Sequence, residues 1–193
     1  MFRASPRQAR AAYLARLRQA IQCVARAEVV GSGLAPDERH GITVLPHGRT
    51  ATDLIPLYTS DRQADFLLRV RESYVLDVHP DRGDRVRYGV KTVSYAYAIC
   101  DRDERELLAY HWHPEGVSDV TVPHLHIPRI PPMPLPRTDP TREVALGEMH
   151  LPTNYVHLED IVELLIREFA IVPLRADWQA TLAESRSELD RER

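Results

Sequence analysis

The sequence has few cysteines and no long uninterrupted run of apolar residues. Its 193 residues include two cysteines, Cys23 and Cys100, too few for a disulfide framework or a four-thiolate zinc site. Both lie beside apolar residues, and we interpret them as small core residues. No window approaches about 18 consecutive apolar residues, so no membrane-spanning helix is predicted. The N-terminus lacks the uninterrupted apolar run of a signal peptide, and we expect a soluble protein of the cytoplasm.

Lysine is almost absent. Lys91 stands alone against 24 arginines, which we interpret as a coding bias toward GC-rich codons rather than as a sign of phosphate binding. The net charge is −3, so the overall charge of the protein does not attract nucleic acid. Hydrophobic residues make up 44% and charged residues 27% of the chain, which is enough to bury a core. We therefore expect a single domain over residues 1–193.

Both ends of the chain have helical periodicity. Residues 5–28 begin with Ser5 as the N-cap and Pro6 at the first helical position, as a helix start requires. The arginines of this helix are interpreted as a solvated face. We assign 1–30 to an N-terminal amphipathic helix. We assign 157–193 to two C-terminal helices, the first over 157–169 and the second starting near Asp177. The apolar stripe of the first helix comprises Ala12, Leu14, Leu17, Ile21 and Val24.

Alternating patterns over 42–151 predict an antiparallel sheet. The fold class is therefore α+β, with a sheet of about four to six strands and helices packed mainly on one face. Strands are expected at 42–45, 66–78, 90–99, 106–113, 124–127 and 148–151, with 54–58 either a strand or a helical turn.

The clearest unit is a hairpin of 90–99 and 106–113, joined by a polar turn at 101–104. A four-residue turn pairs Ile99 with Glu106, Tyr97 with Leu108, Tyr95 with Tyr110 and Val93 with Trp112. One face is then apolar and aromatic. The other face carries Thr92, Ser94, Ala96, Ala98, Ala109, His111 and His113.

A proline-rich insertion, 128–140, interrupts the sheet. It contains Pro128, Pro131, Pro132, Pro134, Pro136 and Pro140, which excludes helix and sheet interior and favours extended polyproline conformation. We interpret it as a covering loop, because it lies between two strands of one domain. The alternative is a docking ligand for a partner.

Histidines concentrate beside this insertion. His111 and His113, and likewise His124 and His126, form two His-x-His segments on predicted strands. Side chains two apart on a strand point to one face about 7 Å apart, so a pair can reach one metal ion such as zinc. Glu115, Asp119, Glu148 and His150 could add or orient a ligand. Metal-free acid/base chemistry on a ribonucleotide is the second interpretation, and packing in a polar seam is the third.

The order SYAY (94–97), turn, ELLAYHW (106–112), HLH (124–126) and the helix HLEDIVELLIREF resembles the TumE-like toxin family of bacterial toxin–antitoxin systems. The resemblance covers about residues 66–170. It implies a ribonuclease with an RNA substrate and an antitoxin partner. Tyr110, His124 and His126 match the family's tyrosine and His-x-His, whereas His111 stands where the family has an acidic residue.

We therefore predict a toxin-like, nucleic-acid-cleaving enzyme of prokaryotic type. His111, His113, His124 and His126 are the predicted catalytic acids and bases. One alternative is a metal-dependent hydrolase that uses the same four histidines. The other is a non-catalytic interaction module that docks through the first helix and the proline-rich segment. The residues predicted to position a phosphate are Tyr110, Lys91, Arg129 and Tyr95.

Overall fold

The computed structural model describes residues 2–35, 38–48, 52–59, 64–80, 86–115, 119–128, 133–135, 139–144, 147 and 149–190. Its helices are α1 (Pro6–Ile21), α2 (Leu158–Arg167) and α3 (Trp178–Asp190). Its strands are β1 (Ala27–Gly31), β2 (His40–Pro46), β3 (Leu54–Tyr58), β4 (Ala64–Pro80), β5 (Val86–Cys100), β6 (Glu106–Trp112), β7 (His124–His126), β8 (Met133–Leu135), β9 (Asp139–Val144) and β10 (Leu151–Pro152).

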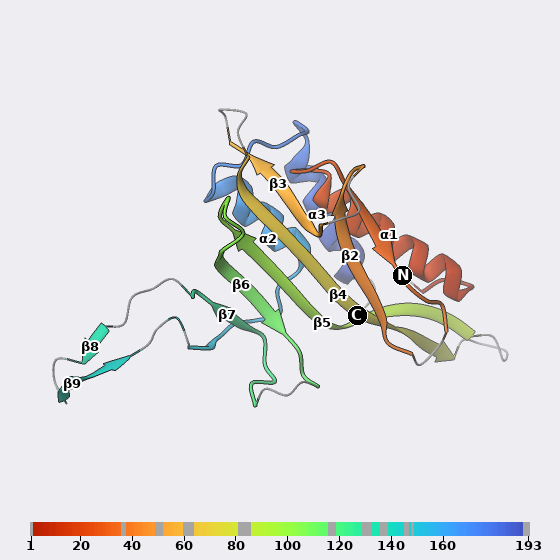
Figure 1. The fold of residues 1–193 in the computed structure, drawn as a ribbon. Coiled ribbons are helices and arrows are strands. Elements are labelled where there is room, and N and C mark those ends of the chain that lie inside the picture. The colour runs from red at the N-terminus through yellow and green to blue at the C-terminus, as the bar shows by residue number, and fades with distance from the viewer. Residues whose placement is uncertain are drawn as a thin grey trace.

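Eight of these strands form one antiparallel sheet in the order β1-β2-β4-β5-β6-β7-β10, with β3 paired to β4 beside this path. The α+β class and the antiparallel sheet are confirmed, whereas the expected four to six strands are too few. Figure 1 shows α1, α2 and α3 behind the sheet. The core joins residues of all three helices, such as Leu17, Leu165 and Leu182, to strand residues such as Val70 and Tyr97. In the described part of the chain, no helix has the length and apolarity to cross a membrane.

Helix α1 begins as predicted and ends earlier. The Ser5 hydroxyl accepts a hydrogen bond from the backbone N–H of Gln8, and Pro6 occupies the first helical turn. The helix stops at Ile21, and residues 27–31 form the edge strand β1 instead of helix or loop. The prediction of helix to residue 28 was wrong because pairing of β1 with β2 is a non-local interaction that local periodicity does not reveal.

The buried face of α1 is also rotated relative to the predicted stripe. It includes Tyr13 and Arg16, and Arg16 is only 5% exposed. Its guanidinium donates to Glu159 of α2 across 2.8 Å, and Ser185 of α3 donates to the same carboxylate. The solvated-face interpretation therefore fails for Arg16, which joins three helices by a buried ion pair.

The β5–β6 hairpin has the predicted faces in a different register. Tyr95 pairs with Trp112, and Ile99 pairs with Leu108 rather than with Glu106. The turn is longer than predicted because the Asp101 carboxylate accepts two backbone N–H groups within it, and a bulge follows at the end of β5. A shift of two residues keeps the side chains that β5 and β6 pair on their predicted faces, since strand side chains have a period of two.

A second bulge moves Thr92 away from its predicted face. Ser73 of β4 pairs with Ser94 and Tyr74 pairs with Thr92, so Val93 is the extra residue. Alternation reverses across such a residue. Thr92 therefore faces α1, where its hydroxyl lies 2.6 Å from the hydroxyl of Tyr13.

The described part of the proline-rich insertion forms a small hairpin. β8 pairs with β9 in a separate two-stranded sheet, with Pro134 opposite Glu143. Figure 1 shows this hairpin standing away from the main sheet. It is not a cover in its described part, and strand pairing rather than polyproline conformation organises it. The chain then returns, and β10 pairs with β7 across the base of the insertion.

Candidate functional site

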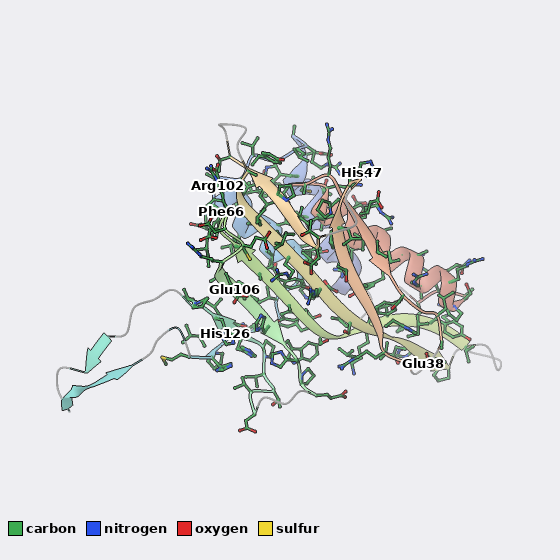
Figure 2. The ribbon with its side chains drawn as sticks, in the orientation of Figure 1. Glu38, His47, Phe66, Arg102, Glu106 and His126 are labelled. Atoms are coloured by element: carbon green, nitrogen blue, oxygen red, sulfur yellow. The ribbon has the colours of Figure 1, made fainter. Side chains whose placement is uncertain are left out.

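Three neighbouring strands bring histidines to one face of the sheet. On β6, His111 lies opposite Ala96 of β5 on one side and opposite His124 of β7 on the other. The neighbouring side chains Tyr110 and Trp112 pack against the core with the helices. Alternation therefore places His111 on the opposite, helix-free face. Figure 2 labels His126 at this end of the sheet, close to the point where the β8–β9 hairpin leaves it.

The fifth histidine joins the group from the far side of the insertion. Leu151 of β10 pairs with Leu125 of β7, so His150 precedes the paired residue and lies beside His126, with ring centres 4.3 Å apart. The backbone of Gly147 also approaches Pro128 closely, and a Cβ at 147 would lie 2.7 Å from the Pro128 carbonyl oxygen. The suggestion that His150 belongs with the two His-x-His pairs is supported by this geometry. We call His111, His113, His124, His126 and His150 the histidine cluster.

Distances within the histidine cluster fit a shared metal ion. Ligand nitrogens of His111, His124 and His126 all lie within 4.8 Å of one another. Their ring centres are separated by 5.0, 5.0 and 5.8 Å. With nitrogen–zinc distances of about 2.0–2.1 Å, two imidazoles on one tetrahedral ion have ring centres about 5 Å apart. The three side chains are therefore close enough together to hold one ion.

His124 has the hydrogen-bonding state of a metal ligand. Its Nδ1 lies 2.8 Å from the carbonyl oxygen of Val122, and because a carbonyl only accepts, Nδ1 carries the proton. Nε2 is then the unprotonated nitrogen, with a free lone pair, and the side chain is fully buried. It has no hydrogen-bond partner among the described residues. A backbone carbonyl that holds the second nitrogen is the usual support of a metal-binding histidine.

Burial and crowding keep the cluster neutral. Desolvation, and then the neighbouring imidazoles, lower the pKa of His111 from 6.5 to about 4. Desolvation is also the main cause that lowers the pKa of His124 and of His126. Neutral imidazole is the form that binds metal. A protonated general acid at neutral pH is correspondingly disfavoured at His111.

Several predicted site residues lie elsewhere. Tyr95 and Tyr110 face the core on the helix side, where the Tyr95 hydroxyl accepts the backbone N–H of Val156. Lys91 lies on the exposed part of β5, five positions from the Ala96 that faces His111, about 15 Å along the strand. Arg129, like Glu148, lies outside the described residues. The structure does not bring Tyr95, Tyr110 or Lys91 to the histidine cluster.

The sequence did not reveal a buried polar cluster on the opposite face. Glu72 of β4 is 4% exposed and accepts hydrogen bonds from the hydroxyls of Tyr13 and Tyr97. Desolvation raises its pKa, against the opposing influence of Arg16. Each of these residues stands at an apolar position of its own element. Because they belong to distant segments, no spacing in the sequence connects them.

Acidification gives a first test of the neutral cluster. We expect the free energy of unfolding of the metal-free protein to fall between pH 6.5 and pH 4, because unfolded His111 gains a proton near 6.5 and folded His111 only near 4. At the lower end of this range the loss from His111 is about 3 kcal/mol. Urea unfolding at a series of pH values measures it. The variant His111→Gln should lose correspondingly less, and identical pH profiles of the two proteins would contradict a depressed pKa.

Comparisons with protein-family models, with curated proteins and with solved structures find no match for this chain.

Proposed function

We propose that this chain is a metal-dependent hydrolase whose metal centre is formed by His111, His124 and His126. The observation that carries the proposal is the state of the His124 ring nitrogens. Its buried Nε2 is an unpartnered lone pair, and nitrogens of two further imidazoles lie within 4.8 Å of its ligand atom. A buried acceptor atom without a hydrogen-bond donor costs free energy, and a metal ion bound to this nitrogen would remove that cost.

The donor set favours zinc or a similar borderline metal. The group consists of imidazoles without a carboxylate, whereas magnesium and calcium prefer oxygen ligands. A zinc ion held by these three imidazoles would still have room for a water ligand and would lower the pKa of that water to about 7. This is the composition of catalytic rather than structural zinc sites. His113 and His150 lie beside the three ligands, with ring centres 5.2 and 4.9 Å from that of His124, and would be the nearest imidazoles of the cluster to exchange a proton with metal-bound water.

The substrate class follows from the resemblance to TumE-like toxins. That resemblance suggests an RNA phosphodiester as the substrate and an antitoxin as the protein partner. Hydrolysis of a phosphodiester is chemistry that a bound metal promotes, because the ion polarises the phosphoryl oxygen and activates water. We therefore propose RNA as the first substrate to test.

A metal-free ribonuclease on the same histidines is the second candidate. The close approach of the two His-x-His pairs supports it, since His113 and His124 have ring centres 5.2 Å apart. The lowered pKa of His111 weighs against it, because acid/base catalysis near neutral pH needs one partner protonated.

One experiment separates the two candidates. Purified protein is treated with chelator, dialysed, and analysed for metal after incubation with zinc; we expect about one ion per chain. A fluorescent RNA oligonucleotide is then cleaved by the zinc form and not by the chelated form, with activity restored by added zinc. Cleavage that persists in chelator would favour the metal-free ribonuclease. Absence of zinc binding together with absence of cleavage would contradict both.

A further inference from the structure

Strand β5 has an open stretch of edge on the side that faces β6. β5 pairs with β4 along its whole length, from Val86 to Cys100. On the other side it pairs with β6 only from Tyr95 onward. At its far end, Tyr88 forms a single bridge to Arg3, with two backbone hydrogen bonds of 2.9 Å. Between these points, no strand of the described chain pairs with this edge.

The open stretch presents unpaired backbone groups in a known direction. In an antiparallel ladder, a residue that exchanges both hydrogen bonds with its partner alternates with one that points away. Tyr88 exchanges both bonds with Arg3, so Val90 and Thr92 direct their N–H and C=O groups to the same side. Lys91, between them, directs its backbone groups to β4. The edge therefore offers two adjacent positions for a further strand.

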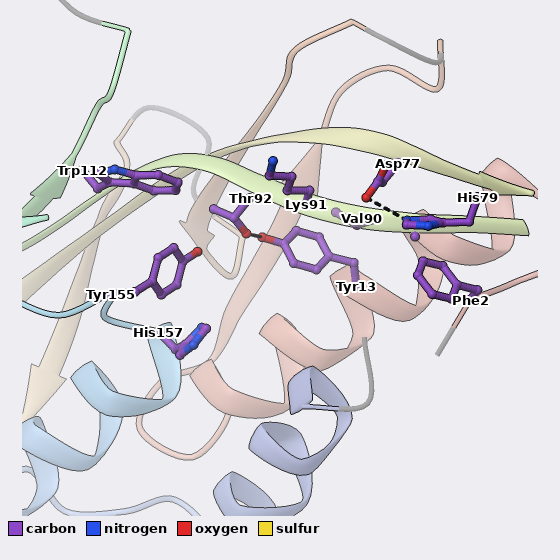
Figure 3. Close-up of a pocket in the computed structure, with 11 residues that line it drawn as sticks. Phe2, Tyr13, Asp77, His79, Val90, Lys91, Thr92, Trp112, Tyr155 and His157 are labelled. Atoms are coloured by element: carbon purple, nitrogen blue, oxygen red, sulfur yellow. Dashed lines mark hydrogen bonds and ion pairs between the residues drawn. The ribbon is translucent and has the colours of Figure 1, made fainter. Parts of the chain in front are cut away.

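A cavity of about 440 Å³ lies against this edge. Figure 3 shows Thr92 and Tyr13 meeting on one side of β5, with Trp112 and Tyr155 beside them. These aromatic rings line the cavity on the helix side and offer apolar contacts. Lys91 points to the other side of the strand, away from Tyr13 (Figure 3).

Lys91 supplies a charge without a counter-ion. It is exposed, and it forms no ion pair or hydrogen bond with any residue that the structure describes, whereas Arg71, Arg167 and Arg175 each pair with a carboxylate. It is also the chain's single lysine. An acidic side chain opposite Lys91 on an added strand would lie about 5 Å away between Cβ atoms and pair with it.

We propose that an extended segment of a partner protein adds to β5 as an antiparallel strand, with the pattern apolar–acidic–apolar. Its two apolar side chains lie opposite Val90 and Thr92, on the face with Tyr13, Trp112 and Tyr155. Its acidic side chain lies opposite Lys91, on the other face. Backbone hydrogen bonds provide affinity and the alternating side chains provide specificity, as in other strand additions. This docking edge is independent of the histidine cluster.

The test uses the full chain and the fluorescent peptide acetyl-Thr-Val-Glu-Val-Thr-amide. We expect saturable binding with a dissociation constant below about 1 mM. Methylation of the two valine nitrogens blocks the bonds to Val90 and Thr92, whereas methylation of the glutamate nitrogen, which points away, is the matched control. The first change should weaken binding by at least about tenfold, and the second by less than about threefold.

Variants of the protein test the same bonds from the other side. Val90→Pro removes the outward N–H and keeps the ladder to β4, since proline is tolerated where its nitrogen faces an open edge. It should weaken peptide binding by at least about tenfold, while Val90→Ala, which keeps the N–H, stays within about threefold of the native chain. Circular dichroism and urea unfolding of both variants report whether the fold is intact.

The charge pair has its own control. Lys91→Gln should weaken binding of the glutamate peptide and leave a glutamine peptide unaffected. The proposal is overturned if the native chain fails to bind the peptide at 1 mM. It is equally overturned if the native chain binds the valine-methylated peptide as tightly as the unmethylated one, or if Val90→Pro binds the unmethylated peptide as tightly as the native chain does. The cavity would then hold a ligand without strand pairing. None of these outcomes bears on the metal centre.

Discussion

Replacement of His124 by alanine is expected to raise the dissociation constant for zinc by at least about 100-fold. The substitution removes the ligand whose lone pair is already oriented and dehydrated, by burial and by the hydrogen bond to Val122. Loss of an outer partner alone costs 10–100-fold in metal affinity in other sites, and loss of a direct ligand costs more. Competition with a chromophoric chelator measures the constant, and zinc-dependent RNA cleavage should fall in parallel.

The matched control for this variant is His47→Ala. His47 is 72% exposed and pairs with Glu28, away from the histidine cluster, so its loss should leave zinc affinity unchanged. His111→Ala provides a second ligand variant, which guards against a local folding defect at the buried position 124. Unchanged zinc affinity in both ligand variants, with intact circular dichroism, would exclude the proposed centre.

Replacement of Arg16 by methionine is expected to lower the free energy of unfolding by about 3–5 kcal/mol. Arg16 and Glu159 form an ion pair in which the side chains are 5% and 0% exposed. Without Arg16 the carboxylate of Glu159 stays buried, and among the described residues the hydroxyl of Ser185 is then its one side-chain donor. An unpaired charge in the interior is far more costly than the pair is stabilising. Urea unfolding of the two proteins at neutral pH measures the difference.

The double variant Arg16→Met with Glu159→Gln distinguishes the buried charge from simple loss of packing. Removal of both charges should recover at least half of the lost free energy, since no uncompensated ion is left in the core. If the double variant is as unstable as Arg16→Met, the cost comes from packing of the side chain. Side-chain packing, rather than the buried ion pair, would then hold helices α1, α2 and α3 together.

Local patterns in the sequence were sufficient for the start of α1 and for most of the faces of the central hairpin. Ser5 and Pro6 predicted the start of α1 because capping depends on adjacent residues. Alternation along 90–113 predicted which side chains share a face, with Thr92 as an exception, because the period of a strand is two. For the same reason, alternation predicted that His111 and His113, and likewise His124 and His126, point to one face of their strand, whereas the pairing of β6 with β7 came from the tertiary structure.

Tertiary structure alone decided the register, the membership of the histidine cluster and the partner of Arg16. The bulge at Val93 turned Thr92 toward α1, and a one-residue insertion in a ladder leaves no mark in a polar–apolar pattern. His150 reached the cluster because β10 returns to β7 across the insertion. Arg16 found Glu159 at a separation of 143 residues. Such contacts depend on which distant segments meet in the core, and local patterns in a single sequence do not show which segments those are.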